Sequence, residues 1–429
     1  MRKSIMALEG VDIEVPAVGT DLPIDESSID GDISEVTSVM TDAENVNDSI
    51  DEAVETAITF ESISAQLYKS AANGGMSYES IRAVEIAVEH MCVRVGYKPR
   101  KSRFALEAYS AESAGDKVKA VGKFVADSAK ALWAYVVKAA IAAYGFIKKF
   151  AEAFFASTER YAEKAEAIIA RCEQVKDDTS PGKLDTNPYI EIMRDKNKPL
   201  TPEEFISKYN GYMKDDAVGI EEFAKILSFI TGITGIIGKG GEYDASKVSD
   251  CFNESFDTSG GNKFTSLPFG DVGIIVSAPI GNTPAMPGPD TNPNVTNTKS
   301  YTVKIDKSTQ FKDLKGAEYD ALAPTQVRKL AVIVKDHMAQ YASYKNKDTV
   351  FEGAVKGFID QIKKYENRSE EESEATAKSY ASLAKCAIHF ANESLSQMRK
   401  YDLKVAGTAL KLCAASLKIH SSAGASENA

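Results

Sequence analysis

The sequence predicts a mainly α protein with long helices, a C-terminal helical bundle and a small β unit in the middle of the chain. A stretch without proline, from Ser113 to about Asp177, repeats apolar residues at helical spacing, and the C-terminal quarter does the same. Strand-like patterns occur at 272–276 and 301–305, between those two helical regions. With 429 residues, the chain is long enough for a sizeable core and for two or three structural units.

The N-terminal quarter is strongly acidic. Gly10 through Tyr68 contains fifteen Asp and Glu and no Lys or Arg. Residues 1–112 hold 9 basic and 21 acidic side chains, a net charge of −12, whereas 113–429 hold 42 and 41, a net charge of +1. Because 11–52 is also poor in aromatic residues, we expect that segment to be disordered. A solvated acidic tail and a removable prosegment both agree with this composition.

Two helices are predicted within 53–96. The first ends at Asn73, where two glycines follow, and the second has Ser77 as its N-cap and Gly96 as its C-cap. A basic linker follows at 98–103, but beside so acidic a segment it gives little support for nucleic-acid binding.

The third unit, 108–178, is one long helix rich in Ala and Lys. Its centre, 131–150, is apolar on nearly all sides, which is typical of a buried or a membrane helix. Lys138 interrupts the apolar run before it reaches the roughly 20 residues that a membrane span needs. We therefore expect core or oligomer packing, with membrane contact through 131–155 as the alternative.

Residues 179–322 are predicted to form a mixed α+β region. Thr201 is followed by Pro and two Glu, which is a strong helix start. The uncharged run 226–238 is too short to span a membrane, so we expect a buried helix with glycine-mediated close packing. Five prolines between 279 and 293 predict an extended loop.

The C-terminal unit, 323–429, is predicted to be a helical bundle. Helices are expected from Ala323, over 353–365, from Ser369 to about Met398, and through Leu403 to Leu417. Small Ala and Ser residues on their apolar faces permit close antiparallel packing.

The sequence predicts no catalytic residues, no cofactor and no metal site. The glycine run from Gly232 to Gly240 lacks the spacing and the hydroxyl residue of a phosphate-binding loop. Cys386 and His389 could share a metal ion, but two ligands do not make a structural zinc site. The five Cys form no CxxC pair, which favours free thiols in a reducing compartment. An enzyme is therefore the least favoured class.

Two tripeptides that end in Glu, Ala105-Leu106-Glu107 and Ser110-Ala111-Glu112, stand where the charge changes and the long helix begins. With the acidic segment, the short helical pair and the Ala/Lys helices, this layout resembles the internal head proteins of giant tailed phages of the phiKZ-like and T-even-like kinds. In the giant phages the prohead protease cuts after Glu when a small residue stands two positions earlier, and both tripeptides meet that pattern. The T-even pattern, with Leu or Ile in that position, is not met.

The resemblance implies that 1–107 is an acidic propeptide and that the prohead protease is a partner. The implied cleavage lies between Glu107 and Ala108 or between Glu112 and Ser113, and we favour Glu107. The mature protein would be a non-enzymatic structural component of the capsid interior, made in the host cytoplasm, and its ejection with DNA is a further expectation. Other capsid or core proteins, a second copy of the chain and packaged DNA, without sequence-specific binding, are the other partners implied.

Two alternatives stay open on sequence alone. The apolar stretches could belong to a membrane-active helical protein that its acidic segment holds inactive. The chain could also be an unprocessed helical scaffold, with an intact N-terminus in its native source.

Overall fold

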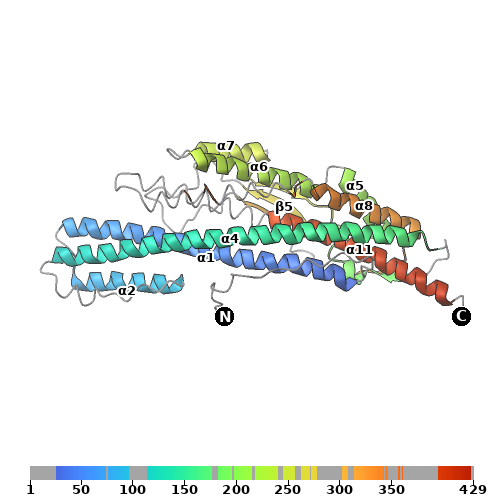
Figure 1. Ribbon diagram of the computed structural model, residues 1–429, viewed down its shortest axis with the longest axis horizontal. Helices are drawn as coiled ribbons and strands as arrows, with labels where there is room; N and C mark the ends of the chain where they lie inside the picture. Colours follow the sequence, from blue (N-terminus) through green and yellow to red (C-terminus); the bar gives the residue numbers. More distant parts are fainter. Residues whose placement is uncertain are drawn as a thin grey trace.

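The computed structural model describes residues 26–73, 76–95, 114–175, 182–195, 198–214, 218–239, 245–256, 262–270, 272–277, 302–307, 314–342, 344–345, 356–357, 360 and 395–426, and all statements below concern these residues. The fold is mainly α-helical with a small strand unit in the middle of the chain, which confirms the predicted class. Its shape is elongated, because two long helices run side by side and the other elements pack along them (Figure 1).

The long pair consists of α1 (Glu26–Ala72), with 47 residues, and α4 (Ala114–Cys172), with 59 residues. At a rise of 1.5 Å per residue they are about 70 Å and 88 Å long. They are antiparallel: at one end the Ser64 hydroxyl donates to the carbonyl of Gly122, 3.0 Å away, and at the other Tyr161 donates to the carbonyl of Ile29, 3.3 Å away. The pair is therefore a long helical hairpin.

The expected disorder over 11–52 is wrong for 26–52, which belongs to α1; residues before Glu26 lie outside the described part of the chain. Ile29, Val36 and Met40 recur at helical spacing and are at most 5% exposed. The burial of these residues on one face of the helix stabilises it, although the average composition of the segment predicts disorder. The acidic composition reflects the other faces of the same helix.

The predicted end of the first helix and start of the second are confirmed. Helix α1 ends at Ala72, and α2 (Tyr78–Arg94) begins after Ser77, whose hydroxyl accepts from the amide of Ser80 at 3.2 Å. Helix α2 lies beside the long hairpin at one end (Figure 1). The ion pair between Arg94 and Glu52, 2.5 Å, connects α2 to α1.

The apolar centre of α4 is packed partly into the protein. Leu132, Trp133 and Val136 are at most 2% exposed, whereas Ile141 is 53% exposed. Among the helices described, none combines the length and the apolar character required to cross a bilayer.

The middle of the chain contains three small antiparallel sheets. One is formed by β4 (Asn262–Ser266), β5 (Val272–Ser277) and β6 (Thr302–Lys307) in that order, with Ile274 opposite Thr265 and Ile305. The strands predicted near 272–276 and 301–305 are thus confirmed. In the other sheets β1 (Lys183–Asp185) pairs with β7 (Glu318–Asp320), and β2 (Arg194–Asp195) with β3 (Lys198–Pro199). The proline-rich segment 279–293 lies outside the described residues.

Three helices accompany these strands: α5 (Pro202–Lys214), α6 (Val218–Lys239) and α7 (Ala245–Phe256). Helix α5 starts as predicted, because the Thr201 hydroxyl accepts from the amide of Glu204 at 3.1 Å while the Glu204 carboxylate accepts from the amide of Thr201 at 2.9 Å. The predicted glycine-mediated packing is confirmed between α6 and α7: a Cβ on Gly232 would lie 2.1 Å from the Cys251 sulfur.

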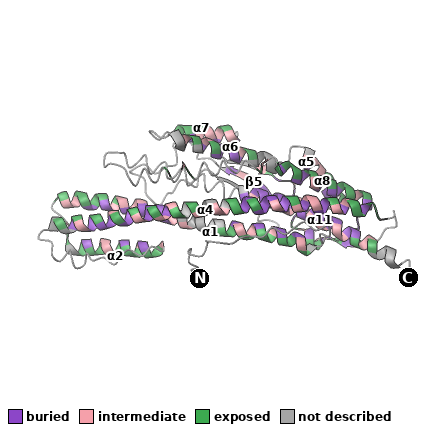
Figure 2. Cartoon of the chain, in the orientation of Figure 1, coloured by how far each residue is buried: buried purple, intermediate pink, exposed green. Residues whose placement is uncertain are grey.

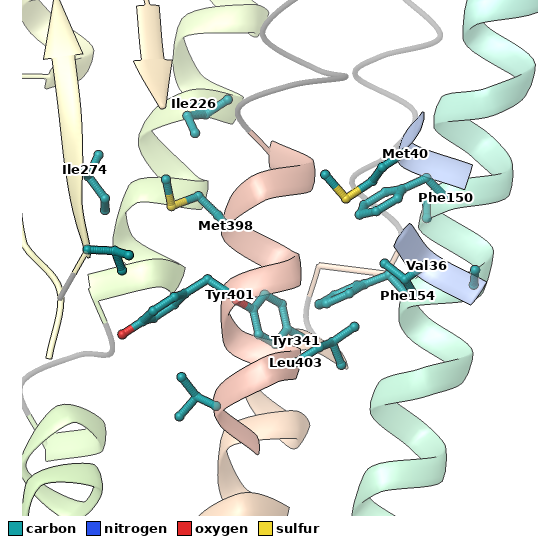
Figure 3. Close-up of a cluster of buried hydrophobic side chains, with 14 of the residues drawn as sticks. Val36, Met40, Phe150, Phe154, Ile226, Ile274, Tyr341, Met398, Tyr401 and Leu403 are labelled. Carbon is teal, nitrogen blue, oxygen red and sulfur yellow. The ribbon is translucent and has the colours of Figure 1, made fainter. Parts of the chain in front are cut away.

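Two C-terminal helices are described, α8 (Pro324–Ala342) and α11 (Leu395–Ser426). Figure 3 shows Phe150 and Phe154 of α4 facing Tyr341 of α8 and residues of α11, with Val36 of α1 beside them. Buried residues concentrate on α4 where α8 and α11 lie beside it (Figure 2). The helices expected over 353–365 and from Ser369 lie largely outside the described residues.

Candidate functional site at the junction of α1, α4 and α11

The predicted cleavage residues Glu107, Ala108, Glu112 and Ser113 lie outside the described residues, in the linker between the end of α2 and the start of α4. A cut in this linker would separate α1 and α2 covalently from the rest of the chain. The candidate functional site is therefore the contact between α1 and the helices that would remain.

Three similar Glu-terminated tripeptides within the described residues lie in regular secondary structure. Glu55 belongs to α1, Glu85 to α2 and Glu318 to strand β7, where it pairs with Asp185. Proteolysis concentrates at exposed loops, since a substrate backbone must leave its helix or sheet to enter a protease. These three competing sites are therefore poorly placed for proteolysis.

The contact of α1 with its neighbours is largely apolar. Its buried hydrophobic residues extend along nearly the whole helix and comprise Ile29, Val36, Met40, Ala53, Val54, Ala57, Phe60 and Leu67. Burial of a large apolar side chain contributes about 1.5–3 kcal/mol, so these contacts contribute on the order of 10 kcal/mol before the entropy of ordering is subtracted. Helix α1 is thus part of the core.

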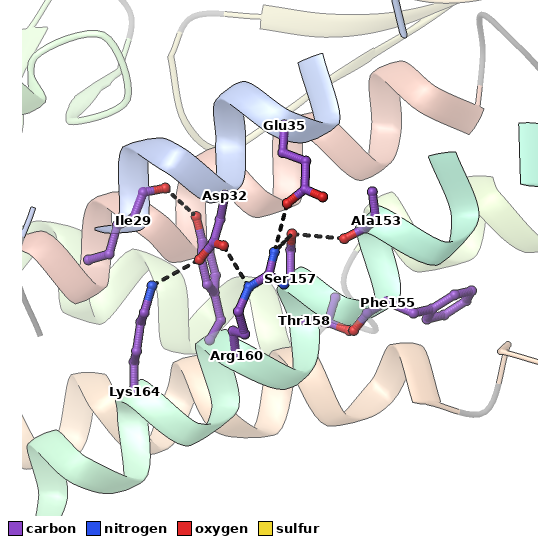
Figure 4. Close-up of polar contacts among 10 residues, drawn as sticks. Ile29, Asp32, Glu35, Ala153, Phe155, Ser157, Thr158, Arg160 and Lys164 are labelled. Carbon is purple, nitrogen blue, oxygen red and sulfur yellow. Dashed lines mark hydrogen bonds and ion pairs between the residues drawn. The ribbon is translucent and has the colours of Figure 1, made fainter. Parts of the chain in front are cut away.

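A cluster of charged residues lies within this apolar contact (Figure 4). Asp32 of α1 accepts from Arg160 Nε at 2.6 Å and from Lys164 Nζ at 2.9 Å, both on α4. Arg160 also donates to Glu35 at 3.1 Å and to the Ser157 hydroxyl at 3.1 Å. The Lys164 side chain is only 3% exposed, so Asp32 supplies the counter-charge that makes its burial tolerable.

Helix α11 also contributes residues to this contact between α1 and α4. Lys411 of α11 forms an ion pair with Asp30 of α1. A Cβ on Gly407 would lie 3.0 Å from the Tyr161 hydroxyl and 3.2 Å from Ile29, so a glycine is needed where α11 crosses α1 and α4. Burial, with a smaller effect from Asp32, raises the pKa of Tyr161 far above its ordinary value, and Tyr161 therefore stays a neutral donor.

A second polar cluster, which sequence reasoning missed, lies among α5, α8 and α11. His337 bonds to the Tyr209 hydroxyl through Nδ1 at 2.7 Å, and its Nε2 lies 3.7 Å from Asp402. Asp402 accepts from Tyr212 at 2.9 Å and also from Tyr341. The partners are far apart in sequence, so no local pattern reveals them.

This second cluster is a structural network. The side chains of His337 and Asp402 are both 0% exposed, which leaves a substrate no approach. Burial raises the pKa of Tyr209 and of Tyr341 well above the ordinary value, and Asp402 adds to the effect, so both phenols stay protonated. Among the described residues His337 Nε2 has no hydrogen-bond partner, while the bonds from the tyrosines connect α5, α8 and α11 through His337 and Asp402.

The other candidates from the sequence are placed as follows. The glycine run from Gly232 belongs to helix α6 as far as Lys239, so its backbone amides do not form a phosphate loop there. Cys386 and His389 lie outside the described residues. Within the described residues, no group of three or more His, Cys, Asp or Glu side chains could hold a metal ion.

The chain is thus an elongated helical protein whose acidic N-terminal helix is built into its core. Its sequence from residue 27 to residue 419 matches the family of phiKZ-like phage internal head proteins. The match covers most of the chain, so the protein belongs to this family. No curated protein and no solved structure gives a significant match.

Proposed function

We propose that the chain is a non-enzymatic structural protein of the phage head, and that the prohead protease cuts it in the linker between α2 and α4. Family membership supports a place in the capsid interior. The observation that supports the cleavage is the position of the two tripeptides in the sequence: both fall after the end of α2 and before the start of α4, whereas Glu55 and Glu85 lie within helices and Glu318 in a strand.

The charge distribution supports a role for the cut. The uncut chain has a net charge of −11, which keeps it soluble and repels DNA while the capsid assembles. Residues 108–429 hold 42 basic and 42 acidic side chains, so removal of the N-terminal segment leaves a body of net charge 0. A neutral body tolerates close packing beside a genome. Synthesis in the host cytoplasm and ejection with the DNA are further parts of the proposal.

Intact mass and N-terminal peptide mapping of the protein from purified particles test the proposal. A mature chain that starts at Ala108 or Ser113 is expected. A chain that starts at Met1 or Arg2 would contradict cleavage, and an unprocessed helical scaffold would then be the better interpretation.

The two cleavage positions are distinguished by substitution. Glu107→Gln should abolish processing if the cut lies there, and Glu112→Gln should abolish it if the second tripeptide is used. Glu85→Gln is the matched control, because it changes the same residue type within helix α2. Normal processing of a chain that carries both linker substitutions would reject both sites.

A further inference from the structure

We propose that α1 covers a cationic surface on α4 and α11 which, after the linker is cut, binds the phosphate backbone of duplex DNA. The inference rests on the proposed cleavage, because in the uncut chain α1 occupies this surface. The surface consists of Arg160, Lys164 and Lys411.

The first argument is the pairing of these three cations. Arg160 and Lys164 come from α4 and Lys411 from α11, and each forms an ion pair with a carboxylate of α1. Their side chains are 34%, 3% and 17% exposed, so α1 and its neighbours withhold most of their charge from solvent. Departure of α1 would remove all of these counter-charges together.

The second argument is the geometry around Asp32. Its two carboxylate oxygens accept from Arg160 Nε at 2.6 Å and from Lys164 Nζ at 2.9 Å, while Glu35 accepts from Arg160 at 3.1 Å (Figure 4). Phosphate oxygens are recognised by the same charge-assisted hydrogen bonds from Arg and Lys. Once α1 has left, phosphate groups can therefore take the positions of its carboxylates and accept hydrogen bonds from the same Arg and Lys side chains.

The third argument is the charge of α11. The helix carries five Lys and Arg and a single acid, Asp402, which is buried in the tyrosine network. Lys404, Lys411 and Lys418 are spaced seven residues apart, which places them on one side of the helix about 10 Å from each other. A row of cations along one helix is typical of surfaces that follow a nucleic-acid backbone.

Acidic residues nearby do not cancel this charge. Glu159 and Glu166 of α4 pair with Lys345 and Lys335, which lie in or just after α8 and stay in the body of the protein. Glu191 pairs with Lys404 and reduces the charge at one end of the row. Arg160 and Lys164 of α4 and Lys411 of α11, by contrast, pair with carboxylates of α1.

Duplex DNA is the occupant that the family's location favours. The protein belongs to the internal head proteins, and the genome is the densest polyanion inside a filled head, with one charge per ~1.7 Å of duplex. The expected binding is independent of base sequence, because three cations on helix surfaces contact phosphates and do not read bases.

The test uses the full chain with the recognition sequence of a site-specific protease in place of residues 105–112, cut in solution. The probe is a labelled duplex of about 20 base pairs and arbitrary sequence, followed by fluorescence anisotropy at about 50 mM salt. We expect the cut chain to bind at least ~10-fold more tightly than the uncut chain. Asp30→Asn with Asp32→Asn, which weakens the hold of α1, should tighten binding of the cut chain further.

Two double variants separate this surface from general charge effects. Arg160→Gln with Lys411→Gln should reduce the slope of log affinity against log salt by about 2. Lys335→Gln with Lys345→Gln removes the same charge from α8 and the turn after it, where the partners are Glu166 and Glu159 of α4, and should leave DNA binding within about twofold of the parent cut chain.

Three outcomes would overturn the inference. They are a cut chain that binds DNA no better than the uncut chain, equal effects of the two double variants, and displacement by sodium phosphate well beyond that by sodium chloride at matched ionic strength. The third outcome would mean that the surface binds free phosphate ions and not the backbone of duplex DNA. The cut is made here by an added protease, so the result does not depend on whether the phage protease uses Glu107 or Glu112.

Discussion

At the scale of single residues, Asp32 has the largest predicted effect on stability. Asp32→Ala would leave Lys164 buried without its counter-charge, and breaking a buried pair in this way costs about 3–5 kcal/mol. Urea denaturation of the full chain should show that loss in the free energy of unfolding.

The matched control is Asp320→Ala. Asp320 pairs with Lys183, but the two side chains are 68% and 58% exposed, and such surface pairs contribute at most about 1 kcal/mol. Equal losses for the two variants would contradict the special role of the cluster around Asp32.

Cysteine reactivity gives a second prediction at this scale. Burial raises the pKa of Cys92 and that of Cys251 to about 11, so at pH 8 only about 0.1% of each thiol is the reactive thiolate. Both should resist iodoacetamide at pH 8 in the folded chain and react readily once it is unfolded in urea. Rapid alkylation of either thiol in the native protein, followed by mass spectrometry of its peptides, would contradict the packing described for α2 and α7.

At the scale of elements, the start of α5 can be tested by one substitution. Thr201→Ala removes the acceptor of the Glu204 amide and should cost about 1 kcal/mol in denaturant titrations. Thr231→Ala is a suitable comparison, because Thr231 lies inside α6 and its hydroxyl donates only to the carbonyl of Leu227, 2.8 Å away. A loss no larger than that of Thr231→Ala would argue against the cap.

The same cap has a defined pH dependence. The hydrogen bond from the Thr201 amide, and then that from Lys198, lowers the pKa of Glu204 below its ordinary value of 4.5. A lowered folded pKa means that the contribution is present above the unfolded pKa and is lost as the pH falls through the folded one. The stabilisation by the Glu204 carboxylate, measured as the effect of Glu204→Ala, should therefore shrink below about pH 4.

Local signals in the sequence predicted several helix ends, although the C-cap of α2 is Val95 and not Gly96 as predicted. Ser77 and Thr201 were identified as caps because a cap needs only one side chain and the helix that follows it. The glycines of the apolar run 226–238 predict close helix packing, and Gly232 is the one that lies against a neighbouring side chain, Cys251. Such features depend on residues a few positions apart.

Features that depend on distant partners were not predictable. The first half of α1 is helical because Ile29, Val36 and Asp32 find an apolar surface and two cations on α4, more than a hundred residues away. The contact between His337 and Asp402 likewise depends on how α8 and α11 are placed. Composition could show the acidic character of the N-terminal segment, but not the complementary surface that orders it.

At the scale of the whole molecule, the long hairpin determines the hydrodynamic size. A compact chain of 429 residues would have a radius of gyration of about 22 Å, whereas α4 alone is about 88 Å long. Small-angle scattering should give a radius of gyration clearly above about 22 Å and a maximum dimension of at least about 88 Å for the monomer. A smaller maximum dimension would mean that α4 is bent or broken in solution.

The hairpin also orders the events of folding. Near the linker, Ser64 meets Gly122 across 58 residues, whereas at the far end Lys164 meets Asp32 across 132 residues. Shorter loops cost less entropy to close, so the two helices should pair first beside the linker and then zip toward the junction with α11. In a chain cut between α2 and α4 that first step becomes an encounter of two molecules, and its rate depends on concentration. The uncut chain is thus the form suited to folding, and a cut chain that has lost α1 could recover the hairpin only at concentrations at which the two fragments meet.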